Sequence, residues 1–153
     1  MESSILTPLQ KTVLVALFDH GLGDRGYYLT GGTALSVFYL HHRYSDDLDF
    51  FTRKRSSLME DFRNFNEILT SIGLVVTSQD VTEAYARLFI HPEDLKDTTL
   101  KIEFARDVPA MMAAPGIYNH ITVDSFEDIS VNKVCTFLAE HLNQKIFVTS
   151  FPS

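Results

Sequence analysis

The sequence predicts an α+β (α/β) fold, in which helical segments alternate with short strands along a single domain, residues 1–153. Two observations lead to this prediction. Several segments repeat apolar residues at every third or fourth position, and short runs rich in aromatic and β-branched residues lie between them. The content of 45% apolar and 22% charged residues is typical of a globular domain with a sizeable core. We find no internal repeat, low-complexity tract or linker.

The first helix is expected to begin at Thr7, because Thr7-Pro8-Leu9-Gln10 has the form of a capping box with proline in the first turn. It should run to about His20 and end at the glycines that follow. Residues 27–30 then predict a short strand. Residues 33–42 predict a second helix, since Leu35, Phe38 and Tyr39 recur at helical spacing.

A third helix is expected over residues 58–72, with Gly73 as its end. Further strands are predicted at residues 74–77, 85–90, 100–104 and 117–123. Between the last two, the proline-bounded loop 108–115 carries two methionines that either line a base pocket or cover the edge of the sheet. A late helix should begin at Ser125, because Ser125 and Asp128 resemble a capping box.

A glycine pair, Gly31-Gly32, lies at the predicted turn from the first strand into the second helix. Glycine lacks a Cβ atom, so a ligand can approach the backbone closely at this turn. The free N–H groups and the positive dipole end of the helix favour an anion such as a triphosphate. Thr33 is suited to capping the helix. Alone, such a pair is most often a simple turn.

A pair of alternating aspartates, Asp47 and Asp49, follows in the apolar run Leu48-Asp49-Phe50-Phe51. In a strand, both carboxylates would point to one face and the apolar side chains to the other. Two carboxylates so close repel unless a cation lies between them, and Mg²⁺ takes such ligands together with substrate phosphates. Asp46 would face away, toward solvent or Arg43. The order of glycine turn and acid pair predicts phosphoryl or nucleotidyl transfer.

Residues 29–51, LTGGTALSVFYLHHRYSDDLDFF, closely resemble the signature of the AbiEii/AbiGii toxin group within the DNA polymerase β-like nucleotidyltransferases. That signature has a GG-T-A-L turn, an H-R-x-S segment and then D-hydrophobic-D-hydrophobic. The resemblance implies a nucleotidyltransferase-like mixed β-sheet with helices packed around it. It also implies that the chain is a minimal or truncated member, because relatives continue from the late helix into a further helical region.

The resemblance further implies a third carboxylate from a neighbouring strand, for which Glu103 in Leu100-Lys101-Ile102-Glu103-Phe104 is the best candidate. The alternative is an exposed Glu103 that pairs with Lys101 on the face of a sheet. A lysine in the late helix belongs to the same pattern, and Lys133 matches it. Its ammonium group would either contact a nucleotide phosphate or extend along the apolar stripe to water.

Arg43 and the basic cluster that follows the acid pair each allow two interpretations. Arg43 and Ser45 are expected, by resemblance, to shape the mouth of the nucleotide site, although Arg43 could instead pair with Asp46 or Asp47. Arg53, Lys54 and Arg55 form the one basic cluster of the sequence. They are either an RNA or triphosphate contact or a solvated loop.

Net charge and cysteine content limit the classes of function that this sequence fits. With 13 basic and 20 acidic residues, the net charge of −7 opposes the general attraction to nucleic acid, although a local patch stays possible. The single cysteine, Cys135, is expected to pack in a buried helix, and it excludes an internal disulfide. No run is long enough to span a membrane and no signal peptide is present, so a cytoplasmic location and no membrane partner are expected.

The sequence and the resemblance together predict a Mg²⁺-dependent nucleotidyltransferase, with Mn²⁺ as a possible substitute. NTP would be held by Gly31, Gly32 and Thr33, and metal by Asp47, Asp49 and Glu103. The resemblance implies transfer of NMP to an RNA hydroxyl, a tRNA 3′ end above all, by the toxin of a toxin–antitoxin pair with a cognate antitoxin. A small-molecule or protein hydroxyl stays open as acceptor. The alternative is a shortened, non-catalytic module that binds a nucleotide or a partner.

Overall fold

The computed structural model describes residues 6–41, 46–55 and 57–150, with side chains described up to residue 142. The helices are α1 (Pro8–Asp19), α2 (Gly31–Ala34), η1 (Leu35–Leu40), α3 (Leu58–Ser71) and α4 (Phe126–Ser150). The strands are β1 (Tyr27–Thr30), β2 (Leu48–Thr52), β3 (Leu74–Val81), β4 (Tyr85–Pro92), β5 (Leu100–Arg106), β6 (Gly116–Tyr118) and β7 (Ile121–Val123). The predicted α+β class is therefore confirmed.

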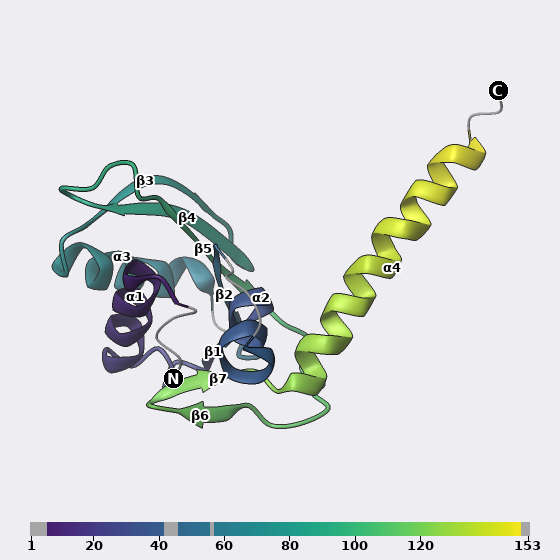
Figure 1. The fold of residues 1–153 in the computed structure, drawn as a ribbon, viewed down its shortest axis with the longest axis horizontal. Coiled ribbons are helices and arrows are strands. Elements are labelled where there is room, and N and C mark those ends of the chain that lie inside the picture. Colours follow the sequence, from purple (N-terminus) through teal and green to yellow (C-terminus); the bar gives the residue numbers. More distant parts are fainter. Residues whose placement is uncertain (1–5, 42–45, 56, 151–153) are drawn as a thin grey trace.

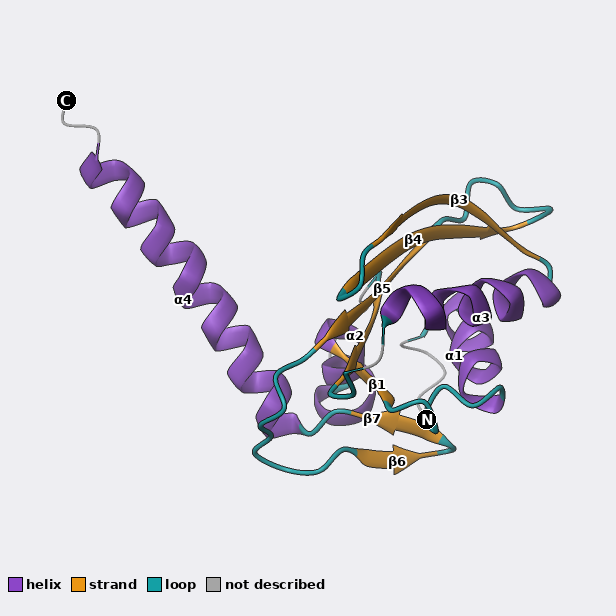
Figure 2. Cartoon of the chain, turned by 180° about the vertical axis from the view of Figure 1, so that it is seen from behind, coloured by secondary structure: helices purple, strands orange, loops and turns teal. Residues whose placement is uncertain are grey.

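One mixed sheet, with seven strands within the described residues, forms the centre of the fold in the order β3-β4-β5-β2-β1-β7-β6. The β2–β5 and β1–β7 pairs are parallel and the others antiparallel. Helices α1 and α3 lie together against one face of this sheet (Figures 1 and 2). The opposite face of β2 and β5 carries Asp49, Lys101 and Glu103 beside Phe51 and Ala105.

Aromatic rings fill the layer between the sheet and α3. Phe104 stacks on Phe50 with ring centroids 5.1 Å apart and on Phe65 of α3 at 4.4 Å. Tyr27 meets Phe65 edge to face at 5.1 Å. Such aromatic pairs stabilise the core beyond the hydrophobic contribution of their buried surface area. This core fixes β1, β2 and β5 side by side, and these are the strands that carry the predicted site.

Local signals predicted the helix starts well. Thr7 and Gln10 form the expected capping box, in which each side chain accepts a hydrogen bond from the other residue's backbone N–H. Ser125 Oγ likewise accepts from the Asp128 N–H at 3.0 Å at the start of α4. These contacts depend only on residues three apart, so the sequence alone is sufficient to reveal them.

The single strand predicted over residues 117–123 is wrong, because the segment is a tight hairpin of β6 and β7. The chain reverses at Asn119 and His120, whose φ angles are 50° and 70°. Positive φ at both central residues is the geometry of a type I′ turn, which matches the twist of the flanking strands. Asn and His are both enriched among the non-glycine residues with positive φ, so neither is unusual at this turn.

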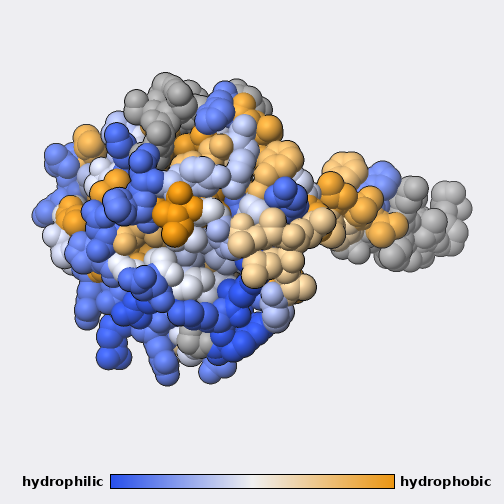
Figure 3. Space-filling view, turned by 90° about the horizontal axis from the view of Figure 1, so that it is seen from below, coloured by the Kyte–Doolittle hydropathy of each residue, from blue (hydrophilic) through white to orange (hydrophobic). Residues whose placement is uncertain are grey.

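The late helix α4 projects from the body of the protein (Figures 1 and 2). Its apolar side chains are exposed from the second turn on, and Figure 3 shows them along the projecting part. The exposed residues are Val131, Val134, Phe137, Leu138 and Leu142. Cys135 is exposed as well, so its predicted burial is wrong. Helical spacing identifies an apolar stripe but cannot show whether anything covers it.

Helix α4 is nevertheless not apolar enough to cross a membrane. The same holds for every other helix in the part of the chain that the structure describes.

Candidate active site

The acid pair lies at the start of β2, on the face of the sheet that α1 and α3 leave open. Asp49 lies within β2 and Asp47 immediately before it. Leu48 and Phe50 between and after them are fully buried on the opposite face. The predicted alternation is confirmed, since neighbouring side chains of a strand point to opposite faces. Asp46 is exposed, as one of its two readings predicted.

Glu103 lies directly beside this pair. In the parallel register of β2 and β5, Asp49 is opposite Glu103 and Leu48 is opposite Ile102. The flanking Ile102 and Phe104 are fully buried on the other side of β5. Because opposed residues of adjacent strands point to the same face, three carboxylates gather on one small area of the sheet.

Two further side chains from β4 and β5 contact these carboxylates. Lys101 Nζ is 3.1 Å from both Asp47 Oδ2 and Glu103 Oε1, so it bridges the two acids. The Tyr85 hydroxyl donates a hydrogen bond to Glu103 Oε2. Glu103 therefore pairs with Lys101, as its alternative reading predicted, and also lies beside Asp49. Burial and the Glu103 carboxylate raise the pKa of Tyr85 to about 12, so the phenol stays protonated.

The pKa of Asp49 rises to about 6. Burial is the main cause, and the neighbouring charges of Glu103 and Asp47 add to it. Lys101 and Lys133 oppose the rise only in part. Burial also disfavours ionised Glu103, but the hydrogen bonds from Tyr85 and Lys101 outweigh it and lower the pKa of Glu103.

The glycine pair lies in the first turn of α2 rather than before the helix. Gly31 has φ +75°, and a Cβ built there would lie 2.5 Å from Asp49 Oδ2. Only glycine fits both the backbone and the space. Thr33 does not cap the helix, because its hydroxyl lies inside α2 and donates to the Asp47 carbonyl oxygen. Thr33 thus ties the glycine turn to the acid pair.

Helix α2 continues as the π-helix η1, and not as the uniform α-helix expected over residues 33–42. The His41 N–H donates to the Ser36 carbonyl five residues earlier, at 2.6 Å, and His41 ends the element with φ 50°. Insertions of this kind are rare and occur often at functional sites. Apolar periodicity is similar in both helix types, so the sequence did not reveal it.

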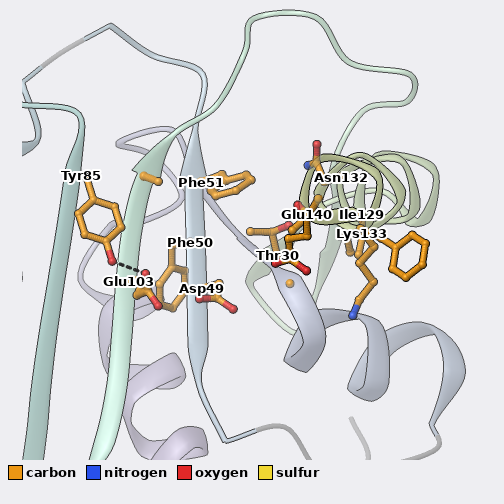
Figure 4. Close-up of a pocket in the computed structure, with 14 residues that line it drawn as sticks. Thr30, Asp49, Phe50, Phe51, Tyr85, Glu103, Ile129, Asn132, Lys133 and Glu140 are labelled. Atoms are coloured by element: carbon orange, nitrogen blue, oxygen red, sulfur yellow. Dashed lines mark hydrogen bonds between the residues drawn. The ribbon is translucent and has the colours of Figure 1, made fainter. Parts of the chain in front are cut away.

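A pocket of about 450 Å³ lies between the sheet and α4 (Figure 4). Asp49 and Glu103 line its sheet side, and Lys133 extends from α4 on the other. Gly31 at the start of α2 lines the pocket as well. Its remaining lining residues are Thr30, Phe50, Phe51, Tyr85, Ala105, Ile129, Asn132, Thr136, Phe137 and Glu140. Lys133 lines this pocket and is also exposed to solvent, so contact with a nucleotide phosphate and extension to water both stay predictions.

The remaining residues predicted for the site either do not line this pocket or fall outside the described part of the chain. Arg43 and Ser45 fall outside the described residues. Arg53 of the basic cluster is neither solvated nor at the pocket, because its guanidinium lies in a buried group of carboxylates. Met111 and Met112 are exposed and do not line the pocket, so the base-pocket reading of that loop is wrong.

Sequence reasoning overlooked Lys101 and Tyr85 as members of the site. Lys101 lies two residues before Glu103, so strand alternation alone places both on one face. In the sequence this spacing was taken only as support for the alternative, an exposed Glu103 that pairs with Lys101. Tyr85 gave no such signal, because its contact with Glu103 depends on the antiparallel register of β4 and β5, in which Tyr85 is opposite Ala105.

The donor chemistry of the three carboxylates fits a divalent cation such as Mg²⁺. Their oxygens are hard ligands, and three carboxylates on one small area of the sheet favour a cation between them. As arranged, no three His, Cys, Asp or Glu side chains in the described part of the chain converge closely enough to hold a metal. The Lys101 ammonium lies between Asp47 and Glu103, so its contacts would have to open.

Replacing Lys101 with Met is therefore expected to strengthen Mg²⁺ binding by about threefold to tenfold. The variant should lose about 1 kcal/mol or less of stability without metal, because the bridging pair is partly exposed. Titration calorimetry with Mg²⁺ checks this. Lys54→Met is the matched control, because it removes the same charge at a position where Nζ donates to the Asp24 carbonyl. Equal affinities in the wild type and the Lys101 variant would contradict the expectation.

The fold is similar to that of two solved structures from Helicobacter pylori. A candidate nucleotidyltransferase aligns with TM-score 0.58 and 22% identity over 83% of this chain and 55% of that one. The protein JHP933 aligns with TM-score 0.60 and 23% identity over 83% and 53%. The chain thus spans about half the length of these structures. A search of curated proteins found no match.

The family follows from the sequence itself. The model of the nucleotidyl transferase AbiEii toxin family, of type IV toxin–antitoxin systems, matches residues 12–146. The chain therefore belongs to this family, and the resemblance drawn from residues 29–51 is confirmed.

Proposed function

We propose that the protein transfers NMP from an NTP to an acceptor hydroxyl in a Mg²⁺-dependent reaction, in which Mn²⁺ can substitute. One observation carries the proposal. Asp49 and Glu103 are directly opposed on parallel strands, and the Gly31 turn and Lys133 border the same pocket of about 450 Å³. A pocket with convergent acids, a glycine turn and a cation offers the groups that nucleotidyl transfer needs.

The residues have distinct roles in this proposal. Asp47, Asp49 and Glu103 hold the metal, which supplies positive charge to the α-phosphate. Gly31 and Gly32 leave room for the phosphates beside the backbone, and Lys133 contacts a phosphate oxygen. Thr33 fixes the Asp47 backbone through its hydrogen bond. The acceptor oxygen bonds to the α-phosphorus, pyrophosphate leaves, and Glu103 assists departure of the hydroxyl proton. Arg43 and Ser45 stay predictions for the mouth of the site.

The acceptor that family membership favours is RNA, and we propose a tRNA 3′ end. The family description refers to toxin–antitoxin systems, so a cognate antitoxin and a cytoplasmic setting with NTPs and tRNA belong to the same proposal. The net charge of −7 gives little general attraction to RNA. Recognition would accordingly be local, at the acceptor end that enters the pocket.

A second candidate is a non-catalytic nucleotide- or partner-binding module. One observation favours it. The Lys101 ammonium lies between Asp47 and Glu103, where a metal would bind. Such a module would bind a nucleotide without turnover.

The test is incubation of the purified protein with Mg²⁺, total RNA and each α-labelled NTP in turn, beside the Asp47→Asn, Asp49→Asn double variant. Labelled RNA that disappears with the variant is the expected result, and the effective NTP identifies the base. If no NTP gives transfer to RNA, to small-molecule hydroxyls or to protein hydroxyls, the proposal that the protein is an enzyme is refuted. Nucleotide binding without turnover would then favour the second candidate.

A further inference from the structure

Arg53 is buried in a group of three carboxylates at the opposite end of β2 from Asp47. Its side chain is only 14% exposed, and its guanidinium carbon lies 4.8 Å from the ring centroid of Tyr28. Arg53 Nη2 is 3.3 Å from Asp107, 3.9 Å from Asp124 and 3.9 Å from Asp128. We call Arg53, Asp107, Asp124 and Asp128 the arginine cluster. One cation is thus shared by three acids from separate segments of the chain.

Two of these acids hold the start of α4. The Asp128 carboxylate accepts hydrogen bonds from Ser125 Oγ at 2.6 Å and from the backbone N–H of Met112 and Ala113 at 3.0 and 3.2 Å. Asp124 Oδ1 accepts from the Ser125 N–H at 3.0 Å. The first turn of α4 is therefore fixed by contacts with acids that Arg53 neutralises.

Asp124 also connects this turn to the glycine turn of the site. Its Oδ2 accepts a hydrogen bond from Thr30 Oγ1 at 3.0 Å, and Thr30 immediately precedes Gly31. The Asp124 N–H donates to the Leu29 carbonyl at 2.8 Å, and its own carbonyl accepts from the Tyr39 hydroxyl at 2.6 Å. The glycine turn and the base of α4 are therefore parts of one hydrogen-bonded unit.

Helix α4 contacts the body of the protein at its base, where Asp128 and Ile129 are buried and the ring centroid of Phe126 lies 5.7 Å from that of Tyr39. Beyond Ser130 its described residues are exposed, apart from the half-buried Asn132. Lys133 lies seven residues after Phe126, which is about 10 Å along a helix. A tilt of about 15° at the base would move Lys133 by roughly 3 Å, enough to break a contact with a phosphate.

We propose that Arg53 is a positioning residue, which holds the first turn of α4 against the glycine turn through Asp124 and Asp128 and so places Lys133 at the nucleotide pocket. This role rests on the proposed function in so far as Lys133 contacts the nucleotide. The orientation of α4 itself does not depend on that function and can be measured without a nucleotide.

The first measurement uses the single native cysteine. A spin label at Cys135 and a second at Ser78→Cys, on the exposed part of β3, report the distance between α4 and the sheet. Cys135 does not line the nucleotide pocket, so the label leaves it open. Arg53→Met should broaden the distance distribution or shift it by about 3 Å. Arg53→Lys should keep most of the wild-type distribution, because it keeps the charge.

Arg25→Met is the matched control. It breaks an arginine–aspartate contact of 3.1 Å with Asp61 of α3, remote from α4. We expect it to change stability but not the label distance. If Arg53→Met does not fold, Asp128→Asn replaces it and should also broaden the distribution. An unchanged distribution in the folded variants would overturn the positioning role, whether or not the protein transfers nucleotides.

The second measurement couples Arg53 to Lys133. Calorimetric titration with Mg²⁺ and each NTP should show affinity at least about fivefold lower for Arg53→Met and for Lys133→Met. The double variant should bind no more weakly than Lys133→Met alone, because Arg53 acts through Lys133. Additive losses would refute that coupling. Absence of NTP binding by the wild type would instead refute the proposed function and leave the label distances to decide the role of Arg53.

Discussion

Asp49→Asn is expected to lower nucleotidyl transfer by roughly a thousandfold or more, while making the protein more stable at pH 7. The activity falls because the variant loses the most buried of the three carboxylates proposed to hold metal. Stability rises because asparagine is uncharged, so the variant avoids burial of an ionised carboxylate and, to a smaller extent, its repulsion by Glu103 and Asp47. We expect a gain of about 1–2 kcal/mol in the free energy of unfolding. Denaturant titration and the transfer assay measure the two effects.

The stability gain should depend on pH in a defined direction. The pKa of Asp49 is about 6 in the folded protein and 3.8 as a model value, so the folded state binds the proton more tightly. The wild type therefore loses stability as pH rises from about 4 to 6 and is at its full disadvantage at pH 7. The variant should be more stable than the wild type at pH 7 and equal to it near pH 4.

The control is Asp80→Asn on β3, whose carboxylate is 67% exposed and 3.8 Å from Arg87. Neither transfer nor the pH dependence of stability should change in this variant. An active Asp49→Asn protein would exclude Asp49 as a required metal ligand. A gain in stability that stays constant down to pH 4 would show that ionisation of Asp49 is not its cause.

Gly31→Ala should lower transfer at least about a hundredfold and destabilise the fold by about 2–4 kcal/mol. The backbone at φ +75° is strained for alanine, and the new methyl group would meet Asp49 Oδ2 at 2.5 Å and Asp49 Cβ at 3.1 Å. The Asp49 side chain must then turn away, and misplacement of a reacting group by about 1 Å has a large effect on rate. Thermal unfolding and the transfer assay are the measurements.

Gly73→Ala separates strain from the clash with Asp49. Gly73 has φ +85°, and a Cβ there would meet nothing within 4 Å. Its substitution should cost about 1–2 kcal/mol through the backbone alone and leave transfer unchanged. Equal stability losses at Gly31 and Gly73, with full activity in both variants, would show that the close approach of Gly31 to Asp49 has no functional importance.

Short-range patterns were sufficient for most elements and for part of the site. The capping box at Thr7 and the alternation of Asp49 with buried Phe50 depend on neighbours in the chain, and the structure has both. The family assignment also came from one continuous segment and agrees with the match over residues 12–146. Interactions within a turn or a strand depend on residues close together in the chain, so they can be predicted from the sequence.

Contacts between distant segments could not be predicted in the same way. Arg53 was expected in solvent or at a ligand, but it lies among Asp107, Asp124 and Asp128, which come from 54 or more positions further along the chain. The exposure of Cys135 and the hairpin at Asn119 were missed as well. Helical spacing and strand propensity describe one element at a time and carry no information about its neighbours.

The sequence by itself determined the family, the elements and the residue types of the site, because each of these depends on short stretches of chain. The tertiary structure alone decided that Glu103 lies opposite Asp49, that Tyr85 contacts Glu103, and that Arg53 holds the base of α4. Strand register and the packing of charges minimise the free energy of the whole fold, so no local segment encodes them.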